Sequence, residues 1–311
     1  MGSAELPDAK SLWSSPAVNH LGKAIVCTVA YADVFDYPLS AAQIHRYLLG
    51  MATDSDSVNQ ALQTDHWVGE RLEHRAGCYT LRKRANLVEL RQRRAMVATQ
   101  MWPQAARYAQ AIARLPFVRL VALTGALTMD NVDPGDDFDF LIVTEAGRLW
   151  LARAIVIGMI VKPASRQGNE VCPNYLVAEH ALAFPEQNLY VAHELSQMVP
   201  LAGFDLYQQI RERNRWTRRF LPNAAGPPRR GDASATTTAL RRSPLEVALR
   251  TPVGAALEHW ERGRKMRRFE RLKQGQTSAS FDVDRCKGHF ESNQEHVLEA
   301  FDERLRKLSN L

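Results

Sequence analysis

The chain has 311 residues, of which 45% are hydrophobic and 24% charged, and a formal net charge of +6. This composition is typical of a soluble globular protein, and the length allows two domains. Four scattered cysteines without a C-x-x-C spacing argue against a disulfide framework and against a zinc site. The first residues lack the pattern of a signal peptide, and no apolar run is long enough to cross a bilayer. We therefore expect a cytoplasmic protein with no membrane partner.

Residues 18–84 have the pattern of a winged-helix-like domain, which follows an N-terminus over 1–17 that we expect to be disordered. The expected elements are helices over 18–36, 40–49 and 55–63 and strands over 68–72 and 79–81. The second helix has a clear start signal, because Ser40 and Gln43 have the spacing of a capping box. Three helices followed by a β-hairpin predict a winged helix-turn-helix domain.

The third helix of this domain is a poor candidate for contacting DNA. Residues 53–65 include three aspartates and no lysine or arginine, so nucleic acid phosphates would repel them. The net charge of +6 suits a protein that handles phosphates without demanding nucleic acid as a partner. We expect this domain to serve internal packing or dimerisation, so a homodimer is one possible state of the protein.

A long helical pattern over 85–115 connects this domain to a central one, and Pro103 is expected to kink or break it. The central domain, over 116–220, alternates strands with helices, as layered α/β and α+β domains do. Its expected elements are strands over 117–124, 137–144 and 172–178 and helices over 147–162 and 189–198. A flexible linker is expected over 221–244 and a basic helical C-terminal region over 245–311.

Two aspartates stand at the start of the second central strand. Asp137 and Asp139 flank Phe138, and side chains at i and i+2 of a strand point to the same face. Their charges repel unless a proton or cation lies between them, and hard divalent cations prefer oxygen ligands. Gly125, at the end of the preceding strand, lets a phosphate approach the backbone. The alternative is a solvated acidic loop, although Asp139 lies within an apolar run, where an unpaired charge is costly.

One motif carries a resemblance to a known family. It reads Thr124-Gly125-Ala126, a spacer from Leu127 to Asp136, and then Asp137-Phe138-Asp139-Phe140. This pattern resembles the nucleotidyltransferase superfamily that includes DNA polymerase β, in its minimal bacterial form, over residues 115 to about 200. The resemblance implies an α+β fold with a polymerase-β-like core, a mixed sheet with flanking helices. The chain departs from the family at Ala126, where a serine or glycine is usual; Thr124, Thr128 or backbone N–H groups could replace the hydroxyl.

The resemblance also implies a reaction and a set of site residues. A nucleoside monophosphate would pass from an NTP, with ATP or CTP as the expected donor, to an unidentified small-molecule or protein acceptor, releasing pyrophosphate. Mg²⁺ or Mn²⁺ would be held by Asp137, Asp139 and a third carboxylate. Glu179 is the candidate for the third position, with an exposed structural glutamate as the alternative. The residues expected to bind the nucleotide are Thr124, Gly125, Ala126, Thr128 and Lys287.

Three functions remain open at this point. The first is a nucleotidyltransferase. The second is a catalytically degenerate module that senses nucleotides, which Ala126 favours, and the third is a winged-helix transcriptional regulator. His193 and Glu194, in the helix expected over 189–198, are interpreted as structural, with Glu194 as a partner for an arginine.

Overall fold

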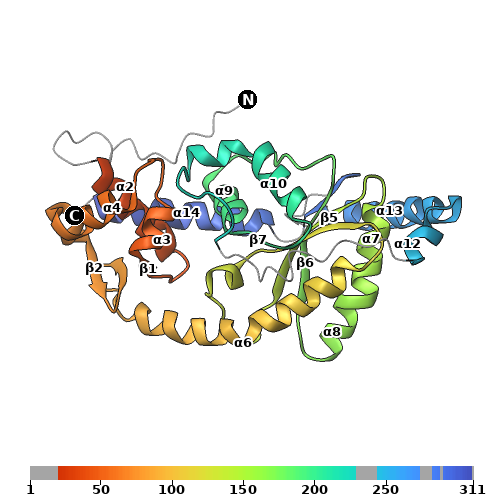
Figure 1. The fold of residues 1–311 in the computed structure, drawn as a ribbon, viewed down its shortest axis with the longest axis horizontal. Coiled ribbons are helices and arrows are strands. Elements are labelled where there is room, and N and C mark those ends of the chain that lie inside the picture. Colours follow the sequence, from red (N-terminus) through yellow and green to blue (C-terminus); the bar gives the residue numbers. More distant parts are fainter. Residues whose placement is uncertain (1–19, 229–243, 274–281, 288–289, 310–311) are drawn as a thin grey trace.

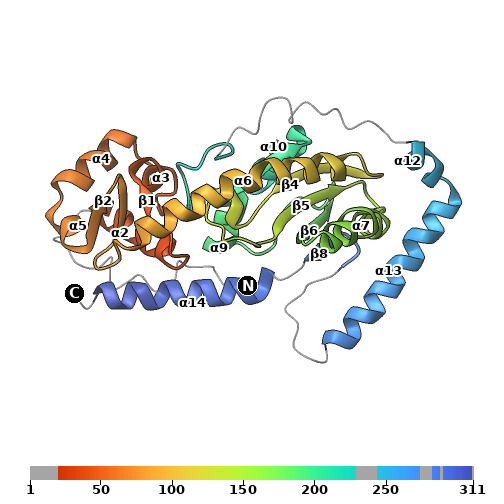
Figure 2. The same cartoon turned by 90° about the horizontal axis from the view of Figure 1, so that it is seen from below.

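The protein is described from a computed structural model, which defines residues 20–228, 244–273, 282–287 and 290–309. The expectations for residues 1–17 and for most of the 221–244 segment lie outside these ranges. A module of short helices occupies one end of the molecule and a five-stranded sheet the middle (Figures 1 and 2). Helix α6 (Leu87–Ala113) runs from the module along the sheet, with Pro103 in its interior. Among the described helices, none is both long and apolar enough to cross a membrane.

The N-terminal module (residues 20–84) has four helices and three strands where three helices and two strands were expected. Its elements are α2 (His20–Asp33), β1 (Leu39–Ser40), α3 (Ala41–Arg46), α4 (Ser55–Thr64), α5 (His66–Arg71), β2 (Leu72–Arg75) and β3 (Cys78–Leu81). The strands form an antiparallel sheet in the order β1-β3-β2. The capping box between Ser40 and Gln43 is confirmed. The strand expected over 68–72 is wrong, because Asp65 accepts two backbone N–H bonds there and caps α5.

The central sheet is mixed, and its strand order is β7-β4-β5-β6-β8. The strands are β4 (Val118–Leu123), β5 (Phe138–Thr144), β6 (Val171–Ala178), β7 (Val199–Ala202) and β8 (Arg285–Lys287). β5 pairs antiparallel with β4 and parallel with β6. The expected α+β architecture, a mixed sheet with flanking helices, is confirmed. The two edge strands were not expected, because runs this short carry little period-two pattern.

Alternation along β5 gives the sheet two distinct faces. Phe138 and Phe140 pack on the face covered by α6 and α7 (Leu149–Val156). Leu141 and Val143 pack on the other face, against α9 (Leu189–Gln197), α14 (Phe290–Ser309) and the N-terminal module. The module and this face therefore share one hydrophobic core.

The remaining helices complete the two layers. They are η1 (Ala126–Met129), η2 (Ile157–Val161), α8 (Lys162–Arg166), α10 (Phe204–Arg213), η3 (Arg215–Arg219), α12 (Pro244–Leu249) and α13 (Pro252–Lys273). α7, η2 and α8 follow one another without interruption, with η2 as a π-helical stretch. The C-terminal basic region begins with two helices, because Pro252 starts α13 after a break.

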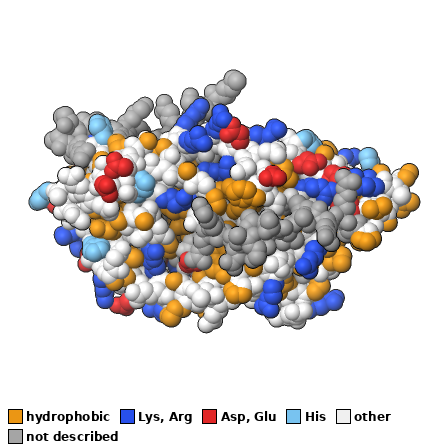
Figure 3. All heavy atoms as spheres, viewed as in Figure 1, with side chains coloured by type: hydrophobic (Ala, Val, Ile, Leu, Met, Phe, Trp, Pro, Cys, Tyr) orange, Lys and Arg blue, Asp and Glu red, His pale blue; other side chains and the backbone are white. Residues whose placement is uncertain are grey.

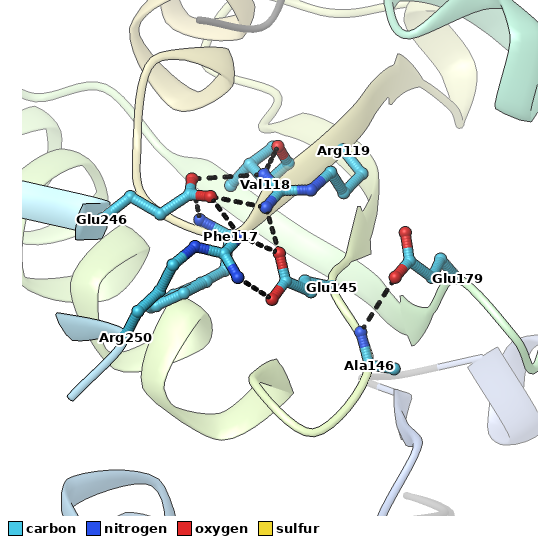
Figure 4. A network of polar contacts seen from close by, with 8 residues as sticks. All are labelled: Phe117, Val118, Arg119, Glu145, Ala146, Glu179, Glu246 and Arg250. Carbon is cyan, nitrogen blue, oxygen red and sulfur yellow. Dashed lines mark hydrogen bonds and ion pairs between the residues drawn. The ribbon is translucent and has the colours of Figure 1, made fainter. Parts of the chain in front are cut away.

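A buried carboxylate attaches α12 to the sheet (Figure 4). Glu246 is 2% exposed and accepts hydrogen bonds from the Phe117 N–H (3.0 Å), Arg119 (2.7 Å) and Arg250 (2.8 Å). Glu145 pairs with the same two arginines. Burial alone would raise the pKa of Glu246, but these hydrogen bonds, led by that from Arg119, lower it to about 2.

Glu246→Gln is expected to lower the free energy of unfolding by about 3 kcal/mol at neutral pH, because two arginines lose a buried counter-charge. The native pKa lies below the ordinary value of 4.5. The contribution is therefore present above pH 4.5 and is lost as the pH falls toward 2. Urea unfolding of both proteins should show a difference that shrinks on acidification. Glu212→Gln, which breaks an exposed pair with Arg215, is the control and should cost less than about 1 kcal/mol. Equal losses in the two variants would contradict the argument.

Candidate functional site

The two aspartates of the motif point to the same face of the sheet, as predicted. Phe138 and Phe140 are buried on the opposite face. Cys172, the register partner of Asp139 on β6, completes a cluster with Asp137 and Asp139. One ligand atom from each of the three lies within 4.8 Å of the others. The cluster lies on the face that the N-terminal module and α9 cover.

Gly125 brings the backbone directly against one of these carboxylates. The Thr124 N–H donates to the Asp139 carbonyl at 2.9 Å, which holds the end of β4 beside the start of β5. Gly125 follows with φ of +72°, and a Cβ built there would lie 2.5 Å from Asp139 Oδ2. Any side chain at this position would collide with the carboxylate and strain the backbone. The glycine therefore leaves a narrow approach to Asp139 beside η1.

The carboxylates are held in an environment that disfavours their charge. Burial, then the nearby charges of Asp137 and Glu194, raise the pKa of Asp139 to about 8. Burial also raises the pKa of Asp137. The pKa of the Cys172 thiol is raised by burial and by the two aspartates, so it stays protonated at neutral pH. Two carboxylates beside a neutral thiol suit a hard cation bound through oxygen better than a metal that requires thiolate.

A third carboxylate faces this pair from α9. Burial raises the pKa of Glu194 to about 7, and its charge raises that of Asp139. Within the described part of the chain, no ion pair joins Glu194 to a lysine or arginine, so the expected arginine partner is not found. The carboxylates of Asp139 and Glu194 share one cavity.

This cavity has a volume of about 280 Å³ and lies between the N-terminal module and the sheet. Residues from α2, β1, η1, β5, β6 and α9 line it, together with Tyr47, which follows α3, and Gly125. Its aromatic lining consists of Tyr31, Phe35, Tyr37, Tyr47, Tyr190 and His193. Phe35 is 39% exposed, whereas Tyr31 and His193 are buried. The module thus builds one wall of the space into which the carboxylates open.

Glu179 does not belong to this site, which corrects the prediction of a metal-binding role. In the parallel pair, Asp139 lies opposite Cys172 at one end, whereas Thr144 lies opposite Ala178 at the other. Glu179 follows Ala178, so the length of β5 separates it from Asp139. Figure 4 shows it beside the Glu145 network, where its carboxylate accepts the Ala146 N–H at 3.3 Å.

The expected nucleotide-binding residues divide into two groups. Gly125 and Ala126 line the cavity. The Thr128 hydroxyl donates to the Gly125 carbonyl at 2.7 Å, and the Thr124 hydroxyl points to the Asp139 carbonyl at 3.4 Å, so both serve the turn itself. Lys287 is 3% exposed on β8 and pairs with Glu186 at 2.6 Å, outside the cavity lining.

Sequence reasoning missed the contribution of α9. Tyr190, His193, Glu194 and Gln197 all line the cavity. Their spacing of i, i+3, i+4 and i+7 places them on one face of a helix. This polar and aromatic stripe in an otherwise apolar helix is the signal that could have identified them.

The site therefore consists of Asp137 just before β5, Asp139 on β5, the bare backbone at Gly125, and a cavity lined by Asp139, Glu194 and aromatic rings. We compared the chain with protein-family models, curated proteins and solved structures, and none of them matches it.

Proposed function

We propose that this protein is a divalent-metal-dependent nucleotidyltransferase that moves a nucleoside monophosphate from an NTP to an acceptor and releases pyrophosphate. The observation that supports this most is the Asp137–Asp139 pair on one face of β5, with Gly125 against Asp139 Oδ2 and a cavity beyond them. Mg²⁺ is the metal that best suits two carboxylates with a phosphate-bearing substrate. ATP and CTP remain the donors we propose.

The residues divide the chemistry between them. Asp137 and Asp139 would hold the metal, which supplies positive charge to the phosphates and lowers the barrier to displacement when bound. The acceptor oxygen attacks the α-phosphorus, and the bond from that phosphorus to the bridging oxygen of the β-phosphate breaks. Glu194 would take the proton that the acceptor hydroxyl loses, since its pKa of about 7 suits a general base. Gly125 leaves the backbone open beside Asp139.

We propose that the central domain is polymerase-β-like and that the N-terminal module is winged-helix-like. The helix and strand order of the module supports the latter. Its role in this proposal is to wall the acceptor side of the cavity, because α2, β1 and Tyr47, which follows α3, contribute to the lining. DNA recognition is less well supported, since α4 carries Asp54 at its N-cap and Asp56 in its first turn.

A nucleotide-sensing module is the second candidate, and one observation favours it. Ala126 offers no hydroxyl to the cavity, and the hydroxyls of Thr124 and Thr128 bind or approach backbone carbonyls of the turn. A phosphate would then meet backbone groups alone, which supports binding better than turnover. The two candidates share a nucleotide site and differ only in turnover.

Thermal unfolding with each of the four NTPs, with and without Mg²⁺, tests the proposed site. We expect one NTP to raise the melting temperature by several degrees only when Mg²⁺ is present, and Asp137→Asn to remove that shift. Pyrophosphate release in the presence of candidate acceptors then separates a transferase from a sensor. No shift with any NTP would refute both candidates.

A further inference from the structure

The cavity beside Asp139 combines acidic side chains with aromatic surface. Asp139 and Glu194 line it, and six of its other lining residues are aromatic or imidazole side chains. No lysine or arginine is found among the lining residues that the structure describes. Arg91 lies over the Tyr37 ring at 4.8 Å and Arg46 over the Tyr47 ring at 5.5 Å, and neither lines the cavity. The two acidic side chains are therefore not balanced by a basic side chain among the described lining residues.

Two buried polar atoms on the cavity wall make no hydrogen bond within the described structure. These atoms are the Tyr31 hydroxyl and the His193 Nε2. Tyr31 and His193 are 3% and 6% exposed, and their rings stack with centroids 4.1 Å apart. Buried polar atoms are rarely left unpaired in folded proteins. Together with the lining carboxylates, they indicate that a polar ligand completes this space.

The basic side chains lie elsewhere. Figure 3 shows several Lys and Arg side chains at the upper edge of the molecule and others along its lower edge. Arg213 of α10 and Arg215, Arg218 and Arg219 of η3 are exposed. An anionic ligand would be attracted to that outer surface, whereas a cation would be favoured inside the cavity.

We propose that the cavity binds an organic cation, a small molecule that carries a protonated amine or a quaternary ammonium group on an apolar body. Cations are attracted to the faces of aromatic rings within about 6 Å of the centroid. A cation bound beside Glu194 and Asp139 would favour the ionised form of each carboxyl group, and the resulting attraction grows as water is excluded. The Tyr31 hydroxyl and His193 Nε2 are placed to bind polar groups on the same molecule.

This inference deepens the proposed function, on which the identification of the cation as the acceptor rests. A donor nucleotide is anionic and would bring its phosphates to the metal at Asp137 and Asp139. The aromatic end of the cavity, built by α2 and α9, is then left for the acceptor. A hydroxyl on the acceptor could reach Glu194 while its cationic group lies among the rings.

The test compares two probes that share one body and differ in charge. We would titrate the full chain at pH 8.5, above the pKa of Glu194, with 2-phenylethylamine and with 2-phenylethanol by calorimetry, in the absence of nucleotide and divalent metal. The ammonium should bind at least about tenfold more tightly than the neutral alcohol. Glu194→Gln should reduce this preference to about threefold or less, while Glu179→Gln, at the far end of β6, should retain it.

Four outcomes would overturn the inference: equal binding of the two probes, no binding of either at 10 mM, an unchanged preference in Glu194→Gln, or displacement of both probes by adenosine, which would assign the rings to the nucleobase. A thermal scan confirms that Glu194→Gln is folded. The thermal unfolding with each NTP and Mg²⁺ tests the proposed function independently of this cation preference. A metal-dependent NTP shift without cation preference would leave that function standing and remove only this inference.

Discussion

Asp139→Asn is expected to reduce nucleotidyl transfer by at least about 10³-fold in kcat/KM without destabilising the metal-free protein. Asparagine keeps the shape of the side chain but removes a charged metal ligand. The raised pKa of Asp139 means that the folded protein carries this charge at a cost. The contribution of protonated Asp139 to the free energy of unfolding is present at low pH and is lost as the pH rises through about 8. The variant should therefore unfold at the same temperature as the wild type or higher at pH 8.5.

Paired measurements of turnover and of the metal-free melting temperature check this expectation. Glu179→Gln is the matched control, because it removes a carboxylate at the opposite end of the same strand pair, outside the site. It should retain activity within about threefold. Retained activity in Asp139→Asn, or equal loss in both variants, would place the metal site elsewhere. Lost activity with a lower melting temperature would show that Asp139 supports the fold instead.

The relative placement of Asp137 and Asp139 could be predicted from the sequence because it depends on the alternation along a single strand. Period-two alternation along β5 fixes which side chains share a face, whatever surrounds the strand. Asp137 and Asp139 therefore came out on one side and Phe138 and Phe140 on the other, as the structure has them. The capping box at Ser40 was equally local, since its two partners lie three residues apart.

The third carboxylate could not be placed in the same way, because its distance from Asp139 depends on how the strands pair and how the helices pack. Counting along β6 put Glu179 on a plausible face. The parallel register with β5 puts it at the opposite end from Asp139. Glu194 enters the site instead through the packing of α9 on the sheet, a contact between segments more than fifty residues apart in the chain. The stripe on α9 marks a polar helix face, but local pattern shows neither the strand register nor the part of the sheet that this face covers.

The same limit applies to the cavity. Tyr31 and Phe35 belong to the N-terminal module, whose order of helices and strands could largely be predicted from the sequence. Nothing in residues 20–84 indicates which face of this module packs against the central sheet. That surface is set by a shared apolar core, in which Val29 of the module and Val143 of β5 are both buried. The N-terminal module thus contributes to the candidate site through packing alone.

Metal binding is expected to depend steeply on pH, which provides a second strong test. Because the pKa of Asp139 is about 8 in the metal-free protein, a cation must displace a proton to reach this carboxylate. The ionised fraction of such a group rises from roughly 1% at pH 6 to roughly 50% at pH 8. The Kd for Mg²⁺ should therefore fall about fifty-fold over this range. Calorimetry in two buffers of different ionisation enthalpy should detect the release of close to one proton at pH 6.5.

Exposed acidic residues provide the contrast that makes this result specific. The pKa of Asp133, which pairs with Arg94, is lowered, so its carboxylate is ionised throughout that range. A cation attracted only to the acidic turn around Asp133 and Asp136 would bind with the same affinity at pH 6 and at pH 8. A pH-independent Kd, or one that survives in Asp139→Asn, would assign the metal to that turn. A fifty-fold dependence that disappears in the variant would assign it to the carboxylate behind Gly125, because there, unlike at Asp133, burial holds a proton that the metal must replace.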